Sequence, residues 1–272
     1  MTVPPDQLPP RPGPLGIALG VVRVTATVGL LAIGTVAVLA ASVIPPRRRK
    51  TRPALRVAGA LCRACLWVAG VRRETDGLER LQAHRGFVFF NHISYLDPLV
   101  LVAAAPMRFL SAEGVRRLPL IGAMAEALGT VFVNRGRGES RRAAREALMR
   151  AVAESSVPVG IAPEGRIGPG GAVLPFRRGA FEVARDARAD VLLVALQFTP
   201  HSYALWQDDE WILRAYWRLC ARTEPVTASL AVVNSPSPIE RPAEAATLAE
   251  HQLALWLGAR GPAQAETPVL AD

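Results

Sequence analysis

The sequence predicts an α/β fold: a mixed, largely parallel sheet flanked by helices, preceded by an N-terminal membrane-anchoring helical segment. Two observations carry this prediction. Short apolar runs alternate with helix-like stretches after Gly70, as expected for a buried sheet whose strands are joined by helices. Before them, the run from Val24 to Ile44 contains no charged side chain and, as a helix of about 1.5 Å per residue, is long enough for a bilayer core.

The composition is both apolar and basic. Of 272 residues, 50% are hydrophobic and 20% are charged, and 32 Lys and Arg against 23 Asp and Glu give a net charge of +9. This apolar content excludes a disordered chain, and three Cys exclude a disulfide framework. Lys50 is the single lysine, so the positive charge consists of arginines, which suit phosphate. A chain that is both apolar and basic predicts a partner that is both apolar and anionic.

The N-terminal part divides into a lead and an anchor. Residues 1–14 are rich in proline and predict a disordered lead, and 15–46 predict a transmembrane or membrane-anchoring helix. Arg23 is expected to snorkel at one end of this helix. The basic cluster Arg47–Lys50 follows two prolines, so the positive-inside rule predicts that all later residues face the cytoplasm. A cleaved signal peptide is the less favoured alternative.

Residues 47–70 combine the basic stretch with an amphipathic helix over 53–70, which is expected to lie at the membrane interface. Its Cys62 and Cys65 have the spacing of half a metal site, but no second pair completes it, so small buried residues are the favoured interpretation. Residues 71–257 form the expected catalytic domain, and 258–272 predict a flexible tail.

Within the expected catalytic domain, apolar runs predict six strands and periodic stretches predict five helices. Their order alternates, which favours parallel pairing. The predicted strands are 87–91, 107–111, 130–134, 157–161, 191–198 and 226–233, and the predicted helices are 97–104, 119–128, 139–154, 177–188 and 243–258.

One polar turn follows the strand at 87–91. His92 and Asp97 are five residues apart, which on a regular helix leaves them about 140° apart and out of contact. A contact therefore requires a turn before a helix begins, and Pro98 favours a helix start there, with Asp97 at its cap. An aspartate bonded to one imidazole nitrogen leaves the other free as a general base. From this motif alone, a solvated histidine beside a capping aspartate is the favoured interpretation.

Two other segments have the composition of anion sites. The strand at 130–134 ends at Arg135, and a glycine-rich stretch with Glu164, Gly165 and Arg166 follows the strand at 157–161. Glycine permits close backbone approach to a phosphate, and arginine supplies forked donors. Taken singly, each segment is better explained by a surface turn with a solvated charge. Because parallel strands end at one edge of a sheet, these segments are expected to converge.

In this order the segments resemble the glycerolipid acyltransferases of the 1-acyl-glycerol-3-phosphate acyltransferase type. The resemblance covers roughly residues 55–235 and rests on ordered motifs: Asn-His-x4-Asp, Gly-x-x-Phe-x-x-Arg, Pro-Glu-Gly, and Phe-Arg-x-Gly. The matching residues are Asn91, His92 and Asp97; Gly129, Phe132 and Arg135; Pro163, Glu164 and Gly165; and Phe176, Arg177 and Gly179.

The resemblance implies a reaction. His92 would take a proton from the acceptor hydroxyl and Asp97 would orient it. The donor would be a fatty acyl thioester of coenzyme A or acyl carrier protein, and no metal or redox cofactor would be required. Arg135, Glu164 and Gly165 would line the acceptor site, with the arginine on its phosphate. The remaining substrate-binding candidates are Asn91, Gly129, Arg166 and Arg177.

The third motif departs from the family pattern. Ala162 stands where the family has Phe, Arg166 where it has Thr, and Ile167 where it has Arg. We hypothesise that Arg166 supplies, from one position earlier, the guanidinium group that the family has at the position of Ile167. The apolar strand at 191–198 also lacks the family's proline.

The sequence thus predicts a membrane-bound O-acyltransferase of phospholipid synthesis in the bacterial inner membrane, with its catalytic domain in the cytoplasm. The expected acceptor is 1-acyl-glycerol 3-phosphate, which would give phosphatidic acid; a lyso-ornithine lipid or similar lysolipid is the alternative. A catalytically inactive membrane-surface binding protein is the alternative from another class. Nucleic acid is not an expected partner, because no recognition motif accompanies the basic charge.

Overall fold

The computed structural model describes residues 9–45, 51–168, 172–205 and 210–259. A seven-stranded sheet, in the order β1-β7-β6-β2-β5-β3-β4, forms its centre. The basic cluster Arg47–Lys50 and parts of the expected lead, glycine-rich stretch and tail lie outside the described residues. The strands are β1 (Val71–Asp76), β2 (Phe87–Phe90), β3 (Arg108–Ala112), β4 (Val131–Val133), β5 (Val159–Ile161), β6 (Val191–Thr199) and β7 (Val226–Val233).

Five neighbouring strands of this sheet, from β6 to β4, run parallel, and β7 pairs antiparallel with β6. Strand β1 is parallel to β7. The mixed, largely parallel sheet predicted from the sequence is therefore confirmed. Because the five parallel strands share one direction, their carboxyl ends meet at one edge, and the loops that follow them are brought together there.

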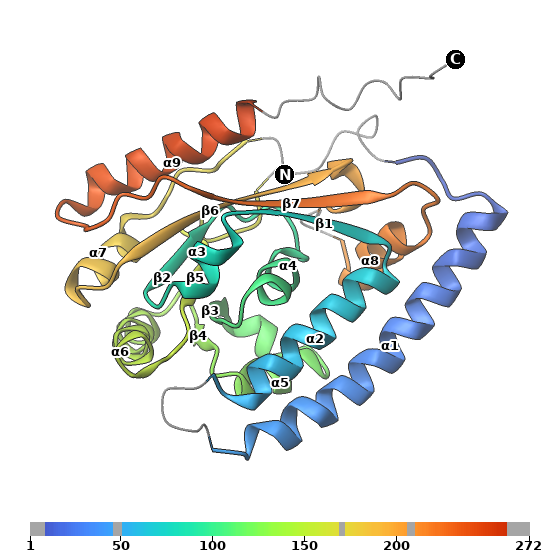
Figure 1. The fold of residues 1–272 in the computed structure, drawn as a ribbon, viewed down its shortest axis with the longest axis horizontal. Coiled ribbons are helices and arrows are strands. Elements are labelled where there is room, and N and C mark those ends of the chain that lie inside the picture. Colours follow the sequence, from blue (N-terminus) through green and yellow to red (C-terminus); the bar gives the residue numbers. More distant parts are fainter. Residues whose placement is uncertain (1–8, 46–50, 169–171, 206–209, 260–272) are drawn as a thin grey trace.

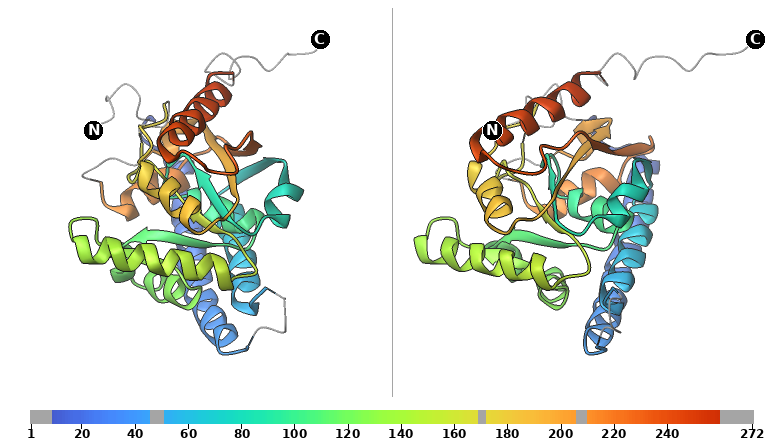
Figure 2. Two further views of the ribbon diagram at one scale, coloured as in Figure 1. Left: turned by 90° about the vertical axis from the view of Figure 1, so that its left-hand side faces the viewer. Right: turned by 60° about the vertical axis from the view of Figure 1, so that its left-hand side comes forward.

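Helices cover both faces of the sheet, as Figures 1 and 2 show. Alternate residues of β2 enter opposite cores: Phe87 and Phe89 face the α6, α7 and α9 side, while Val88 and Phe90 face the α2 and α4 side. The helices are α1 (Pro14–Ser42), α2 (Pro53–Val68), α3 (Leu78–Ala83), α4 (Asp97–Ala104), α5 (Ile121–Ala127), α6 (Gly138–Glu154), α7 (Arg178–Asp186), α8 (Ile212–Cys220) and α9 (Pro242–Ala259), with 3-10 turns at Glu113–Arg117 and His201–Tyr203.

Helix α1 lies beside α2 along one side of the molecule (Figure 1). A stripe of mostly small residues faces the protein: added side-chain atoms at Gly16 and Gly20 would meet Ala221 after α8, and at Gly34 would meet Leu61 of α2. The other side of α1 is apolar and exposed, including Leu15, Val22, Ile33 and Val36. The described residues contain one helix, α1, that is long and apolar enough to cross a membrane.

Arg23 does not snorkel at a helix end as expected. Helix α1 begins at Pro14, which places Arg23 inside it. Its Nη1 atom donates to the carbonyl oxygens of Cys220, at 3.0 Å, and Arg222, at 2.8 Å. These carbonyls lie at the C-terminal end of α8, where unpaired acceptors attract a cation. Arg23 therefore joins α1 to the sheet domain.

Candidate active site

The predicted site residues follow the carboxyl ends of neighbouring parallel strands. His92 follows β2, Glu164 follows β5, and Arg135 follows β4. In the sheet, β5 lies directly beside β2, so the loops carrying His92 and Glu164 are adjacent. The convergence expected from strand order is thus observed for these three residues.

A tight turn brings His92 and Asp97 together. The Nδ1 atom of His92 lies 2.7 Å from the Oδ2 atom of Asp97. The same oxygen accepts the backbone N–H groups of Ile93, at 2.8 Å, and Ser94, at 2.9 Å. The expected position of Asp97 at the helix cap was wrong: it is the first residue of α4, and its carboxylate turns back to the preceding loop, whose N–H groups have no helical partner.

This arrangement orients the imidazole for proton transfer. Asp97 is fully buried, whereas the side chain of His92 is 23% exposed. Burial raises the pKa of Asp97, and the hydrogen bonds from His92, Ser94 and Ile93 oppose that shift. With Nδ1–H donated to Asp97, the Nε2 atom of His92 carries the free lone pair. The pair can therefore accept a proton from a group that approaches from solvent.

Glu164 is buried beneath the backbone of His92. Its Oε1 atom accepts the N–H of His92 at 2.9 Å, and the N–H of Gly168 donates to the carbonyl oxygen of His92 at 2.6 Å. Both polar backbone groups of His92 are therefore bonded to the loop after β5. Burial raises the pKa of Glu164 to about 7, against the hydrogen bonds from the backbone of His92 and Leu174.

Asn91, a predicted substrate-binding residue, is completely buried. Its Nδ2 atom donates to the carbonyl oxygen of Leu196 at 2.9 Å, and its Oδ1 atom accepts the N–H of Leu196 at 2.8 Å. Asn91 thus uses its amide to join the end of β2 to β6. In the structure this side chain supports the turn between His92 and Asp97 from behind and has no exposed surface.

Two arginines flank Gly165. The Nη1 atom of Arg135 donates to the carbonyl oxygen of Gly165, and an added Cβ at Gly165 would lie 2.9 Å from the Nε atom of Arg177. Gly165 has a φ of +75°, which favours glycine. Burial, together with the nearby charge of Arg177, lowers the pKa of Arg135. An anion bound between these two guanidinium groups would offset their mutual repulsion, so this position suits an anionic ligand.

The structure separates Gly129 from these residues. Gly129 precedes β4 and Arg135 follows it, so the strand lies between them. Its φ of +80° instead serves the turn between α5 and β4, where an added Cβ would meet the side chain of Arg108. Arg166 is exposed beside Glu164 and Gly165, in the loop after β5. Gly129 therefore lies at the opposite end of β4 from Arg135, and its expected part in substrate binding stays a prediction.

Ser94 is a supporting residue that the sequence did not single out. Its hydroxyl donates to the carbonyl oxygen of Ala204 at 2.6 Å and accepts the N–H of Leu96 at 3.1 Å. Ser94 therefore joins the turn between His92 and Asp97 to the loop after β6. A serine two residues after the histidine gives no signal of this contact, because its partner is 110 residues away.

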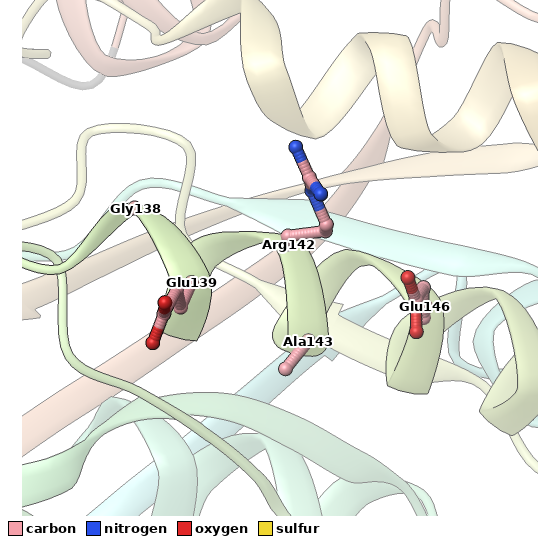
Figure 3. A pocket seen from close by; sticks show the side chains of 5 residues that line it. All are labelled: Gly138, Glu139, Arg142, Ala143 and Glu146. Carbon is pink, nitrogen blue, oxygen red and sulfur yellow. The ribbon is translucent and has the colours of Figure 1, made fainter.

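A separate hollow of about 540 Å³ lies on α6. It is lined by charged and small side chains of this one helix, as Figure 3 shows. Arg142 points away from Glu139 and Glu146 in that view, so these charges do not converge on one ligand. The site after β2, β5 and β4 is therefore the better candidate for chemistry.

Comparison with known proteins gives three findings. Residues 72–199 match the family model described as acyltransferase. A 1-acyl-sn-glycerol-3-phosphate acyltransferase of Neisseria gonorrhoeae is 39% identical over 111 residues, which cover 40% of this chain and 42% of that protein. A lyso-ornithine lipid O-acyltransferase of Rhodobacter capsulatus is 31% identical over 158 residues, which cover 54% of this chain and 56% of that protein. The chain thus matches about half the length of these relatives or less.

The fold has a counterpart among solved structures. The 1-acyl-sn-glycerophosphate acyltransferase of Thermotoga maritima superposes with a TM-score of 0.68 over 93% of this chain and 98% of that one, at 21% identity. The structural alignment extends well beyond the family match, so the similarity in fold includes elements outside residues 72–199. Residues 72–199, a little less than half of the chain, therefore match the acyltransferase family model, and the fold resembles that of the Thermotoga maritima protein.

Proposed function

We propose that the protein transfers a fatty acyl group from a thioester to the free hydroxyl of a lysophospholipid. The contact between His92 and Asp97 is the observation that carries this proposal. The Nε2 atom of His92 takes the proton of the acceptor hydroxyl as its oxygen attacks the thioester carbonyl carbon. The tetrahedral intermediate collapses, the carbon–sulfur bond breaks, and the leaving thiolate takes the proton from His92. An ester and a free thiol result, and no metal or redox cofactor takes part.

The supporting residues have distinct roles in this proposal. Arg135 and Arg177 bind the phosphate of the acceptor beside Gly165, because both guanidinium groups flank that peptide and neither forms an ion pair with a described carboxylate. Glu164 and Asn91 hold the backbone of the catalytic turn and do not touch the acceptor. Exposed Arg166 extends the phosphate site toward solvent. The donor is an acyl thioester of coenzyme A or acyl carrier protein.

The preferred acceptor is 1-acyl-sn-glycerol 3-phosphate, giving phosphatidic acid. Arg135 and Arg177 favour this acceptor, because its phosphate monoester supplies negative charge that balances the two guanidinium groups. A lyso-ornithine lipid is the second candidate. Its support is the Rhodobacter relative, whose match is longer than that of the Neisseria protein, and the altered third motif at Ala162, Arg166 and Ile167.

The proposed location is the cytoplasmic face of the cell membrane. Helix α1 packs against α2, α5 and α8 and exposes its opposite, apolar side. A helix with the sheet domain along its length is suited to lie within one leaflet, because a perpendicular crossing would draw α8 into the hydrocarbon. The basic residues Arg47–Lys50 support an orientation toward the cytoplasm.

An acceptor screen tests the function. The purified chain in mixed micelles is incubated with an acyl thioester and, in turn, with 1-acyl-glycerol 3-phosphate, lyso-ornithine lipid and lysophosphatidylethanolamine. Thiol release and the mass of the product are measured. We expect acylation of the phosphate-bearing acceptor and its loss in His92→Ala, while His251→Ala, an exposed histidine of α9, stays active. Full activity of His92→Ala would refute the assigned base, and absence of thiol release with every acceptor would refute the reaction.

A further inference from the structure

A second polar cavity lies between the start of α1 and α8. It has a volume of about 710 Å³. Its described lining contains four arginines and two glutamates, so the cavity is positively charged overall. The charged lining residues are Arg11, Arg214, Arg218, Arg222, Glu210 and Glu224.

Two of these arginines are fixed in the wall. Arg218 donates from Nη1 to Glu210 and from Nη2 to the carbonyl oxygen of Leu205, both at 2.5 Å. Arg222 is 3% exposed and donates to the carbonyl oxygens of Ala69, Leu219 and Gly70, none of which carries a charge. Glu210 therefore neutralises Arg218, while no described carboxylate is paired with Arg222.

The other two arginines are free to reach a ligand. Arg11 and Arg214 are exposed, and the structure shows no hydrogen bond or ion pair from either side chain to another described residue. Trp217 and Tyr203 line the cavity as well, and the guanidinium carbon of Arg222 lies 6.0 Å from the ring centre of Tyr203. The cavity thus presents two exposed arginines beside the buried Arg222 and the partly buried Arg218, with the aromatic rings of Trp217 and Tyr203 next to them.

The surroundings of this cavity are apolar and exposed. Leu15 and Val22 of α1 are 66% and 65% exposed, and Trp211 and Leu213 at the start of α8 are 72% and 52% exposed. Exposed tryptophan beside exposed aliphatic side chains is typical of the headgroup level of a membrane. A ligand in this cavity can therefore have an anionic head and apolar chains.

This cavity is distinct from the site around Gly165. The sheet order places β6 on one side of β2 and β5 on the other. Arg135 and Gly165 belong to the β5 side, whereas the cavity lies beyond β6, where Tyr203 follows that strand. The two arginine groups therefore lie on opposite sides of the catalytic turn.

We propose that this cavity binds the phosphate of an anionic phospholipid, with Arg11 and Arg214 on the phosphate and the acyl chains along the exposed side of α1. The net positive lining selects the anionic head, and the continuous apolar surface of α1 selects a lipid over a soluble anion. This site goes beyond the proposed acyl transfer, since its ligand is a membrane lipid that is not consumed.

Binding of a short-chain phosphatidylglycerol, kept below its micelle concentration, tests the proposal by calorimetry on the full chain. We expect the double variant Arg11→Gln, Arg214→Gln to bind at least about tenfold more weakly, because two charge-assisted contacts are lost. Arg142→Gln on α6 is the matched control and is expected to bind as the wild type does. Short-chain phosphatidylcholine is expected to bind more weakly than phosphatidylglycerol.

Competitor arms distinguish the sources of the anion. Inorganic phosphate and coenzyme A are each added before the lipid. Equal affinity of the double variant and the wild type for phosphatidylglycerol would overturn the site. Inorganic phosphate that binds as tightly as the lipid would overturn the lipid as its ligand, and loss of coenzyme A binding alone in the double variant would assign the cavity to the donor instead. Because lipid binding is measured without turnover, its failure is separate from failure of the acyltransferase reaction.

Discussion

The Nδ1 atom of His92 and the Oδ2 atom of Asp97 lie 2.7 Å apart, and that oxygen also accepts two backbone N–H groups of the turn between them. The carboxylate therefore shapes the turn and orients the imidazole at the same time. Its loss should affect both, whereas a change that keeps the acceptor oxygen should affect the imidazole alone.

Asp97→Asn separates these two effects. Its amide oxygen can still accept the N–H groups of Ile93 and Ser94, but no negative charge stabilises a protonated His92. We expect kcat to fall by about 10²- to 10⁴-fold with little change in KM, because His92 loses the charge that orients it and stabilises its protonated form, and so becomes a much weaker general base. Steady-state kinetics and a thermal melt measure this, with His251→Ala as control. A variant that keeps its melting temperature and its kcat would show that the pair does not act in catalysis.

Asn91→Ala tests the contact with β6. The change leaves the N–H and the carbonyl of Leu196 without their side-chain partner in a fully buried place. We expect a loss of about 2–4 kcal/mol in the free energy of unfolding, since each unsatisfied buried group costs about 1–3 kcal/mol. Urea unfolding measures it. Exposed Asn134→Ala is the control, and equal destabilisation of the two variants would contradict the assigned role.

Much of the fold follows from local pattern. Predicted bounds match the structure for α4 at residues 97–104 and for β7 at 226–233, because each is an apolar segment between clear breakers. Strand β1 was missed because its residues after Val71 are polar and exposed on the sheet edge. Helix α8 was missed because its nine residues mix aromatic and basic side chains, and its buried side is determined by α1.

The site could be predicted only in part. The position of His92, Glu164 and Arg135 at one edge of the sheet could be predicted, because each follows a strand and parallel strands end at the same edge. Motif membership could not say which side chains face the backbone: Asn91 and Glu164 turn inward to β6 and to His92. It also grouped Gly129 with Arg135, although β4 lies between them. The direction of a side chain depends on tertiary packing, which spacing does not contain.

Glu164→Gln tests the buried carboxyl. A pKa of about 7 against an ordinary value of 4.5 means that the folded state prefers the protonated form, so the folded protein binds more protons between these values. The wild type should therefore lose up to about 3 kcal/mol of stability relative to Glu164→Gln as pH rises from about 4.5 to about 7. Urea unfolding of both proteins at each pH measures this difference. A difference that is independent of pH would show that Glu164 does not titrate in this range.

Arg135→Gln tests the phosphate site. We expect KM for a phosphate-bearing acceptor to rise about tenfold or more, because one charge-assisted bond is lost, while kcat changes little. Arg178→Gln is the matched control, because Arg178 is exposed, adjacent to Arg177 in sequence, and paired at 3.5 Å with Glu182. An unchanged KM in Arg135→Gln would place the acceptor phosphate elsewhere.

Arg23→Met tests the attachment of α1 to the sheet domain. The change keeps an unbranched side chain but removes the two hydrogen bonds to the carbonyls at the end of α8. We expect the free energy of unfolding to fall by about 1–3 kcal/mol. The loss should appear first as opening of α1, because among the described residues the side-chain hydrogen bond that is left between α1 and α8 is the one of 2.6 Å between Thr27 and Tyr216. Hydrogen exchange measured by mass spectrometry on the detergent-solubilised chain should show faster exchange in α1 and unchanged exchange in α9. Arg80→Met, on exposed α3, is the control. Equal exchange of α1 in both variants would mean that its packing on α2 alone holds it in place.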